Sequence, residues 1–253
     1  MPQQKQYKVL LIGDSCEDEY IYGKCERLSP EAPVPVMKFS KTEVKAGMAG
    51  NVCLNLQAFD MHITFLTNSE KIVKTRMIDE KSNQQLLRVD VEDTVKPLHL
   101  PVSTDSFDAV VISDYNKGYV TDKKLFEIVS ECNVPIFIDS KKQYLPNKKN
   151  CFVKINDIEY SKLSQDCQID NLIVTKGGEG CLYNNTLYPA EKVKVYDVAG
   201  AGDTFLAALV YGYLCYESIE RAILLANKAA SIAVQNQGTY VLTEDDVNGF
   251  LQD

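Results

Sequence analysis

The sequence predicts an α/β fold: a mostly parallel central sheet, helices on both of its faces, and a small β-sheet projecting from it as a lid. Short, nearly continuous apolar runs recur along the chain, as expected of strands that are buried on both faces. Helical patterns separate several of these runs, and this alternation favours parallel strands. Two further segments, containing prolines and alternating polarity, fit the edge strands of a separate sheet.

The strands predicted for the central sheet are, in chain order, Lys8–Ile12, Ala109–Ser113, Val134–Ile138, Cys151–Ile155 and Asn171–Thr175. The predicted helices are Asn51–Ala58, Thr121–Cys132, Asp157–Ser164, Thr204–Leu214, Ser218–Gln235 and Thr243–Leu251. The last begins with a rough capping box formed by Thr243 and Asp246. A strand-like run, Lys192–Tyr196, leads into the turn before the fourth helix.

The projecting sheet is predicted from residues 20–44 and 74–90. Pro33 and Pro35 lie in the first segment, and the second contains the strand-like run Gln84–Val89. We interpret the two segments as a lid over a binding site, within a single domain of residues 1–253. A plain β-hairpin insertion is the alternative.

The composition is that of a globular protein with a sizeable core: 253 residues, 45% hydrophobic, with a net charge of −8. An acidic chain argues against nucleic acid as a partner. No apolar run is long enough for a membrane span, and the amino terminus lacks the apolar region of a signal peptide. The 8 cysteines form no C-x-x-C pair. We therefore expect a soluble cytoplasmic protein with reduced cysteines and no membrane partner.

Polar residues follow each predicted strand of the central sheet. They include Asp14, Asp114, Asp139, Asn156 and Lys176. Because the carboxyl ends of parallel strands meet at one edge, these residues predict a crevice there that binds a polyanion. Asn156 and Glu159 share a helix face and are placed to reach Mg²⁺ through water.

The turn Gly200-Ala201-Gly202-Asp203 precedes a strongly apolar helical run. Small residues at such a helix start leave backbone N–H groups open to an anion, and Asp203 adds a carboxylate beside them. This combination suits phosphoryl transfer to a hydroxyl. Taken alone, it is equally explained by Asp203 acting as a helix N-cap and by ordinary turn glycines.

The chain resembles the ribokinase-type (PfkB-like) carbohydrate kinases, and within them the heptose 7-phosphate kinases of bacterial lipopolysaccharide synthesis. The runs that carry the resemblance are Gly13-Asp14 with Asp18, Leu28-Ser29-Pro30-Glu31-Ala32-Pro33-Val34-Pro35-Val36, Lys74-Thr75-Arg76, Gln84-Gln85-Leu86-Leu87-Arg88-Val89-Asp90, Ser113-Asp114-Tyr115-x-Lys117-Gly118, Asp139-x-Lys141, Asn156-x-x-Glu159 and Asp197-x-x-Gly200-Ala201-Gly202-Asp203-Thr204.

This resemblance implies a ribokinase-like fold and a role for each matching position. Asp203 is the expected base, and the backbone of Gly200, Ala201 and Gly202 is expected to hold the transferred phosphoryl group. The implied substrate-binding residues are Asp14, Asp18, Gly47, Asn51, Arg88, Lys117 and Lys141. The implied residues for ATP and Mg²⁺ are Asn156, Glu159, Thr175, Gly177, Gly180 and Asn227, with Glu159 toward the metal. The lid of such kinases often pairs two subunits, so a homodimer is expected.

The chain departs from the family pattern in three places. Met48 stands where relatives have a glycine that lets the sugar approach the backbone. The stretch after Thr67 is much shorter than in relatives, which removes part of one layer. Nothing follows Asp253, so the adenylyltransferase domain that often accompanies this kinase is not expected.

The resulting hypothesis is an ATP-dependent kinase that phosphorylates the anomeric hydroxyl of a sugar phosphate, D-glycero-β-D-manno-heptose 7-phosphate, to the 1,7-bisphosphate. A kinase for another sugar or a nucleoside is one alternative, suggested by Met48. A non-catalytic binding protein on a kinase fold is the other.

Overall fold

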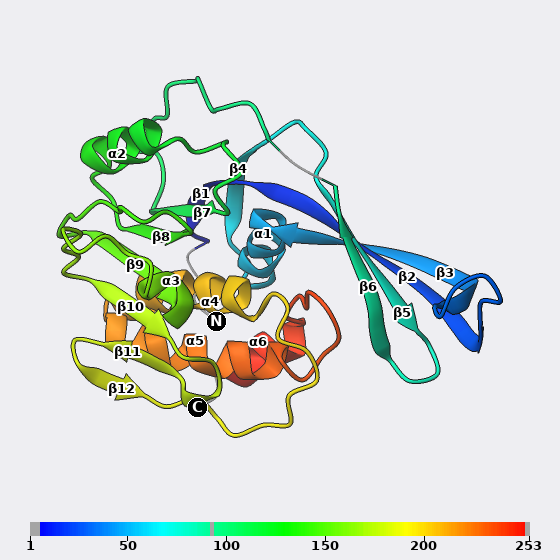
Figure 1. The fold of residues 1–253 in the computed structure, drawn as a ribbon. Helices are drawn as coiled ribbons and strands as arrows, with labels where there is room; N and C mark the ends of the chain where they lie inside the picture. The colour runs from blue at the N-terminus through cyan, green and yellow to red at the C-terminus, as the bar shows by residue number, and fades with distance from the viewer. Residues whose placement is uncertain (1–5, 92–93, 251–253) are drawn as a thin grey trace.

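The structure, a computed structural model, describes residues 6–91 and 94–250. These residues form two sheets (Figure 1). The central sheet has the order β12-β11-β10-β9-β8-β7-β1-β4. Its strands are β1 (Lys8–Gly13), β4 (His62–Thr67), β7 (Ala109–Asp114), β8 (Ile136–Ser140), β9 (Cys151–Asn156), β10 (Leu172–Thr175), β11 (Cys181–Tyr183) and β12 (Thr186–Tyr188).

The central sheet is parallel from β4 to β10, and β11 and β12 complete it in antiparallel orientation. Gly13 at the end of β1 lies opposite Thr67 and Ser113, and Asn156 at the end of β9 lies opposite Thr175. The predicted meeting of polar strand ends at one edge is therefore confirmed.

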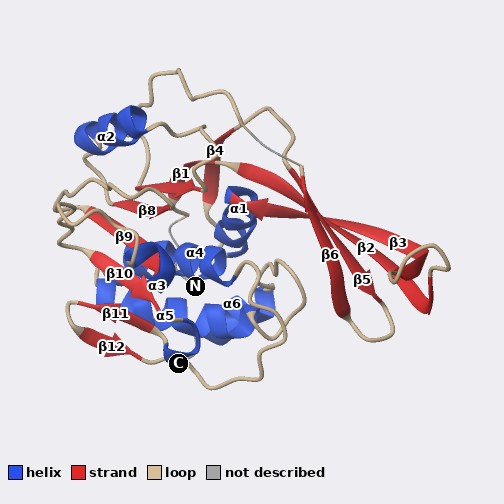
Figure 2. Ribbon diagram, in the orientation of Figure 1, coloured by secondary structure: helices blue, strands red, loops and turns tan. Residues whose placement is uncertain are grey.

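Helices cover both faces of this sheet (Figure 2). One face packs against α1 (Ala49–Ala58), α4 (Ala201–Tyr216), α5 (Ile219–Ala233) and α6 (Glu244–Phe250). The other face packs against α2 (Asp122–Glu131), while the short α3 (Asp157–Tyr160) follows β9 directly. Side chains of β1 alternate between the two cores, with Leu11 on the α4 side and Ile12 on the α2 side.

Extended segments complete the core on the α2 face. Ile72, Val95, Leu98 and Leu145 come from connections between elements, and all four are buried with the sheet residues. Each such apolar side chain contributes about 1.5–3 kcal/mol when fully buried. These segments therefore add to the apolar core on this face of the sheet.

Asn68 secures the short connection that follows β4. Its Oδ1 accepts a hydrogen bond from the Ser15 N–H at 2.8 Å, and its Nδ2 donates to the carbonyls of Ser15 and Glu70 at 3.2 and 2.7 Å. The connection therefore reaches the next strand in a few residues, held to Ser15 by the Asn68 side chain.

The second sheet is the lid, with the order β3-β2-β5-β6. It consists of β2 (Ser15–Leu28), β3 (Pro35–Met48), β5 (Val73–Asp79) and β6 (Gln84–Asp90), and Figure 1 shows it leaving the main body as a twisted ribbon. Asp14 alone separates β1 from β2, and β3 passes directly into α1. The lid therefore begins and ends on elements of the core.

Some predicted elements differ in the structure. The run Lys192–Tyr196 is not a strand: the N–H of Tyr196 donates to the Val234 carbonyl at the end of α5, so the segment crosses a helix end instead of pairing at a sheet edge. The helix predicted over Asp157–Ser164 ends at Tyr160, where tighter three-residue turns replace the α-helical pattern. Strands β4, β11 and β12 were not predicted.

The capping box at the last helix is confirmed. The Asp246 N–H donates to Thr243 Oγ1 at 3.2 Å, and the Thr243 N–H donates to Asp246 Oδ2 at 2.8 Å. The predicted end of that helix, Leu251, lies outside the described residues. Within the described ranges, no helix has both the length and the apolar character needed to cross a membrane.

Candidate active site

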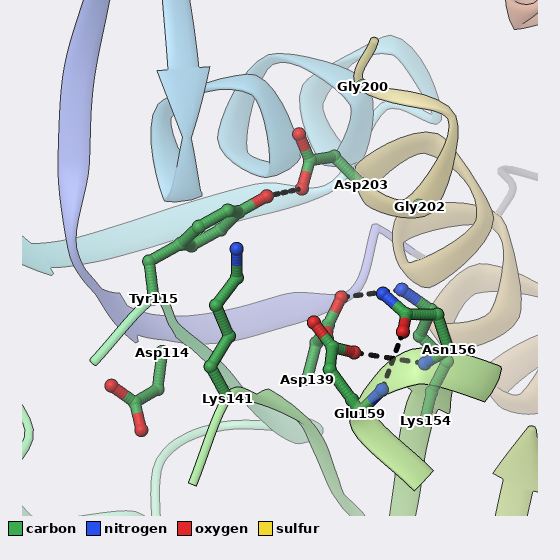
Figure 3. A pocket seen from close by; sticks show the side chains of 10 residues that line it. All are labelled: Asp114, Tyr115, Asp139, Lys141, Lys154, Asn156, Glu159, Gly200, Gly202 and Asp203. Atoms are coloured by element: carbon green, nitrogen blue, oxygen red, sulfur yellow. Dashed lines mark hydrogen bonds and ion pairs between the residues drawn. The ribbon is translucent and has the colours of Figure 1, made fainter. Parts of the chain in front are cut away.

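A pocket lies at the carboxyl edge of the central sheet (Figure 3). It is formed by the ends of β7, β8 and β9 together with the start of α4. Its lining residues are Asp114, Tyr115, Asp139, Lys141, Lys154, Asn156, Glu159, Gly200, Gly202 and Asp203. Two cationic side chains and the start of a helix therefore face one small space, an arrangement that suits a phosphate group.

The turn before α4 requires glycine at position 200, and Gly202 in the first turn of α4 lies close to Lys154. Gly200 has φ 76°, and a Cβ there would lie 2.7 Å from Asn51 Nδ2. A Cβ at Gly202 would lie 2.9 Å from Lys154 Nζ. Helix geometry leaves the N–H groups of Gly202 and Asp203 without acceptors inside the helix, so they remain available to an anion in the pocket.

Asp203 is held by hydrogen bonds to both carboxylate oxygens. The Tyr115 hydroxyl donates to Oδ1 at 2.7 Å, and Asn51 Nδ2 donates to Oδ2 at 3.0 Å. Only 3% of Asp203 is exposed, and this burial raises its pKa to about 6 against the lowering effect of the two hydrogen bonds. A carboxylate with such a pKa is ionised near neutral pH and still accepts a proton readily.

Lys154 forms a buried ion pair below this turn. Its Nζ lies 2.6 Å from Asp139 Oδ2. Burial disfavours the ammonium, but the charge and hydrogen bond of Asp139 outweigh it and raise the pKa of Lys154. The pocket therefore keeps the Lys154 ammonium next to Gly202, paired with the Asp139 carboxylate.

Asn156 and Glu159 form a reciprocal capping box at the start of α3. The Glu159 N–H donates to Asn156 Oδ1 at 2.8 Å, and the Asn156 N–H donates to Glu159 Oε2 at 2.9 Å. Across residues 6–91 and 94–250, no cluster of three or more His, Cys, Asp or Glu side chains is suited to holding a metal ion. Glu159 is one of four carboxylates that line the pocket, and a carboxylate held in this way fits Mg²⁺, which is commonly bound by one or two carboxylates, waters and substrate phosphates.

Asp14 lies in a different setting from the one expected of a sugar ligand. It is fully buried, and its carboxylate accepts hydrogen bonds from the backbone N–H groups of Tyr115, Lys117 and Tyr119 at 2.9, 3.1 and 3.3 Å. Burial raises the pKa of Asp14, and these hydrogen bonds oppose the rise. In this arrangement Asp14 holds the turn after β7, and Lys117 takes part through its backbone.

Asp18 and Gly47 lie together on the lid strands. A Cβ at Gly47 would collide with the Asp18 carboxylate, which forms an ion pair with Arg76. Arg88 is bound to Asp90 by two hydrogen bonds of 2.7 Å on the exposed strand β6. Of the residues expected to bind substrate, Lys141 lines the pocket, Asn51 contacts Asp203, and Asp14, Asp18, Gly47, Arg88 and Lys117 do not line it.

Met48 has a backbone conformation that favours glycine. Its φ is 54° and its ψ is −134°, immediately before α1. Its side chain is 3% exposed and packs in the core on the α2 face with Cys16 and Ile72. Met48 thus adopts a backbone conformation typical of glycine, while its side chain fills space that a glycine would leave empty.

Of the residues expected to bind ATP and Mg²⁺, Asn156 and Glu159 line the pocket, whereas Thr175, Gly177, Gly180 and Asn227 do not. Thr175 Oγ1 donates to the Ile155 carbonyl at 3.3 Å. Gly177 has φ 55° and open space beside it, whereas a Cβ at Gly180 would collide with the Tyr188 carbonyl. Asn227 uses its amide to donate to the carbonyl of Tyr188 at 2.9 Å. This region is open at Gly177 and tightly packed at Gly180.

Sequence reasoning did not select Tyr115, Lys154 or Asp139 as site residues. Tyr115 belongs to one of the runs that carry the family resemblance, but nothing in that run indicates that its hydroxyl reaches Asp203. Lys154 offered a weak signal, because it is the one charged residue in the apolar run Cys151–Ile155. Asp139 was named as a polar strand ending and as part of the run Asp139-x-Lys141, but no role was assigned to it.

The chain is similar to known proteins over most of its length. Residues 148–246 match the family described as pfkB family carbohydrate kinase. The protein named bifunctional protein HldE from Nitratiruptor sp. is 30% identical over 298 residues, covering 96% of this chain and 64% of the relative. The protein of the same name from Campylobacter jejuni subsp. doylei is 32% identical over 300 residues, covering 98% of this chain and 65% of the relative. The chain thus spans less than two thirds of these relatives.

Solved structures share the fold. Ribokinase from Thermotoga maritima has a TM-score of 0.71 and 17% identity, covering 98% of this chain and 100% of that chain. The nucleoside kinase of Methanocaldococcus jannaschii has a TM-score of 0.68 and 17% identity, covering 98% of this chain and 99% of the other. These likenesses confirm the predicted ribokinase-like fold.

One alignment shows that the chain is shorter than the matched part of a relative. It pairs the chain with the HldE protein of Pseudomonas syringae pv. tomato over 310 positions and takes in 100% of this 253-residue chain, so about 57 positions of the relative have no counterpart here. The catalytic-type turn and the polar strand ends nevertheless remain. The family match over residues 148–246, the relatives and the shared fold together support a carbohydrate kinase that resembles the pfkB family.

Proposed function

We propose that the protein is an ATP-dependent kinase that transfers the γ-phosphoryl group to the anomeric hydroxyl of a sugar phosphate, D-glycero-β-D-manno-heptose 7-phosphate, giving the 1,7-bisphosphate. The observation that carries the proposal is the Asp203 carboxylate, which is buried beside the open N–H groups of α4 and a pocket with two lysines. Relatives named HldE support the heptose substrate. The absence of a membrane-spanning helix among the described residues is consistent with action in the cytoplasm.

In the proposed reaction, Asp203 takes the proton of the acceptor hydroxyl. The acceptor oxygen forms a bond to the γ-phosphorus, the bond from that phosphorus to the β–γ bridging oxygen breaks, and ADP leaves. The N–H groups of Gly202 and Asp203, together with Lys154 and Lys141, hold the negative charge of the transferred group. Fixed donors of this kind stabilise charge without reorganising during the reaction.

The acceptor is assigned to the side of Asp203 that faces the lid. Asn51 aligns the base, while Asp18 and Gly47 form the sugar-facing surface of β2 and β3, and Arg88 and Lys117 approach the acceptor phosphate. Asp14 acts through the turn that it holds after β7. The nucleotide is assigned to the open surface at Gly177, with Thr175, Gly180 and Asn227 shaping it. Asn156 and Glu159 are assigned to Mg²⁺, which when bound neutralises charge on the phosphates.

The lid supports a homodimer as part of this proposal. It exposes several large apolar side chains, namely Leu28, Val34, Phe39, Val44, Leu87 and Val89. We propose that the lid of a second copy covers them, since clustered apolar side chains in water favour association. Sedimentation should give a dimer that Phe39→Lys converts to monomer, and a monomeric wild-type protein at tens of micromolar contradicts this assignment.

The decisive experiment pairs a substrate panel with a variant of the base. Release of ADP should require heptose 7-phosphate, and Asp203→Asn should lower kcat by about 10²–10⁴ while nucleotide binding and folding persist. The matched control is Glu244→Gln in the first turn of α6, which also replaces a carboxylate by an amide. It should leave kcat unchanged. Full turnover by Asp203→Asn removes the proposed base.

A second candidate is a kinase for another sugar or a nucleoside. Met48 favours it, because a buried methionine with a positive φ stands directly after Gly47, where the family pattern has a glycine. Turnover of a hexose, a sugar 6-phosphate or a nucleoside, with every heptose phosphate rejected, selects this candidate. Nucleotide binding without phosphoryl transfer to any acceptor selects a non-catalytic protein.

A further inference from the structure

Tyr115 links the turn after β7 to the proposed base. Its hydroxyl lies 2.7 Å from Asp203 Oδ1, and Figure 3 shows the side chain extending from its own turn toward α4. Its backbone N–H donates to Asp14 Oδ2 at 2.9 Å. The residue is therefore fixed at its backbone end by Asp14 and contacts Asp203 at its hydroxyl end.

Two lysines hold the ring of Tyr115. Lys141 Nζ lies 4.5 Å from the ring centroid, and Lys74 Nζ, on the lid strand β5, lies 5.6 Å from it. Ammonium groups at such distances are attracted to the face of a phenol ring. The ring orientation, and with it the direction of the hydroxyl, is thus supported from the core and from the lid.

The hydroxyl of Tyr115 is a permanent donor at the pH values of interest. Burial and the neighbouring Asp203 and Asp139 raise the pKa of Tyr115 well above its usual value. An ionised carboxylate only accepts hydrogen bonds, so the polarity of the contact is fixed from Tyr115 to Asp203. A donor to the ionised form stabilises that form.

We propose that Tyr115 is a positioning residue for Asp203, whose hydroxyl fixes the carboxylate orientation and keeps the base ionised in its buried setting. The proposal rests on the proposed function, in which Asp203 is the base. Asn51 holds the other oxygen from α1, so the two donors leave the remaining lone pairs for the acceptor hydroxyl.

Other groups also act on the charge of Asp203. Lys154 of β9 favours its ionised form, Asp139 of β8 opposes it, and Cys16 of β2 lies near enough to interact electrostatically. None of these contacts is removed when Tyr115 becomes Phe. A change in the titration of Asp203 in that variant therefore reports the lost hydroxyl.

The test is Tyr115→Phe, which keeps the ring and its lysine contacts. Carboxyl ¹³C NMR, with Asp203 assigned by its loss in Asp203→Asn, should show the pKa of Asp203 rising by about one unit above the wild-type value near 6. The acidic limb of the kcat/KM profile should shift to higher pH by the same amount. Activity should recover above pH 8, and the KM for the acceptor should not change. Tyr119→Phe makes the same change four residues further along the chain. It should alter neither the acidic limb of kcat/KM nor the pKa of Asp203.

Three results separate the possibilities. An unchanged pKa of Asp203 overturns the proposal. A lower acceptor KM with an unchanged acidic limb also overturns it, because the hydroxyl would then compete with the acceptor for the base. If no sugar is phosphorylated, the proposed function fails, while the NMR titration still decides the role of Tyr115. Site-specific 3-fluorotyrosine at this position, a stronger donor, should lower the pKa of Asp203 without removing the hydroxyl.

Discussion

Lys154 Nζ lies 2.6 Å from Asp139 Oδ2, and the pair joins two neighbouring strands of the central sheet directly below Gly202. Both side chains are largely buried. A buried pair of this kind costs desolvation energy that its mutual attraction only partly returns. Its position at the start of α4 therefore points to a functional use for the lysine charge beyond stability.

Breaking the pair on one side should destabilise the fold strongly. Lys154→Met leaves the Asp139 carboxylate buried without its partner, and we expect a loss of about 3–5 kcal/mol in the free energy of unfolding. The double variant Lys154→Met with Asp139→Leu should recover most of this loss but little of the activity. Urea denaturation and ADP-coupled kinetics measure the two effects. A double variant that regains full turnover would show that the lysine charge is not needed.

The ionisation of Asp203 should make stability depend on pH. Its pKa is about 6 in the folded protein, against 3.8 for an unperturbed aspartate, so the folded state binds the proton more tightly than the unfolded chain. Stability contributed by this group is therefore present at low pH and is lost as pH rises through the interval from 3.8 to 6. Relative to Asp203→Asn, the wild-type protein should lose on the order of 3 kcal/mol across this window, as measured by urea denaturation at a series of pH values.

The same pKa sets the acidic limb of activity. Below about pH 6 the base is protonated, so kcat/KM should fall tenfold per pH unit. Rate measurements from pH 5 to 8 check this. An activity profile that is flat down to pH 5 would exclude Asp203 as the group whose ionisation limits turnover.

Gly200→Ala should damage both folding and turnover. Alanine at φ 76° costs about 1–2 kcal/mol, and its Cβ would press on Asn51 Nδ2, which aligns Asp203. We expect lower stability and a reduced kcat with little change in nucleotide affinity. Gly249→Ala is the matched control, because a Cβ there meets no atom within 4 Å and the helix α6 should gain slightly. Equal behaviour of the two variants would contradict the tight packing at Gly200.

Met48 offers a test of backbone strain against packing. Removing its buried side chain costs about 2–5 kcal/mol, whereas its positive φ stores about 1–3 kcal/mol that only glycine relieves. We therefore expect Met48→Gly to be less stable than the wild-type protein but more stable than Met48→Ala. Chemical denaturation of the three proteins measures the order. If Met48→Ala is more stable than Met48→Gly, which is the usual order at other positions, the backbone strain at Met48 is small.

The sequence was sufficient for the parts of the fold whose signals are local. The apolar runs predicted five central strands, and the Gly200–Asp203 turn with its neighbouring polar strand ends predicted the pocket edge. The strands β11 and β12 are only three residues long, which is too short to show the alternation of apolar and polar residues that indicates a strand. The run Lys192–Tyr196 has alternating polarity, but it forms no strand, and the Tyr196 N–H donates to the Val234 carbonyl at the end of α5.

Contacts between distant residues were beyond such reasoning. Tyr115 and Asp203 are 88 positions apart, and no local pattern connects them. The resemblance implies that Asp14 is a sugar ligand, yet the turn after β7 supplies three N–H donors that take up its carboxylate. The partner of a polar side chain depends on which loops fold over the strand end, and that is a property of the assembled molecule.

The direct passage from β1 through Asp14 into β2, and from β3 into α1, has a consequence for protein engineering. A segment that enters and leaves its host without spacer residues is not an interchangeable cassette. Exchanging the strands proposed to select the acceptor between related kinases should succeed only when the graft includes β1, Asp14 and the first turn of α1. The junctions of the exchange would otherwise interrupt the hydrogen-bonded segments next to Asn51, which contacts Asp203.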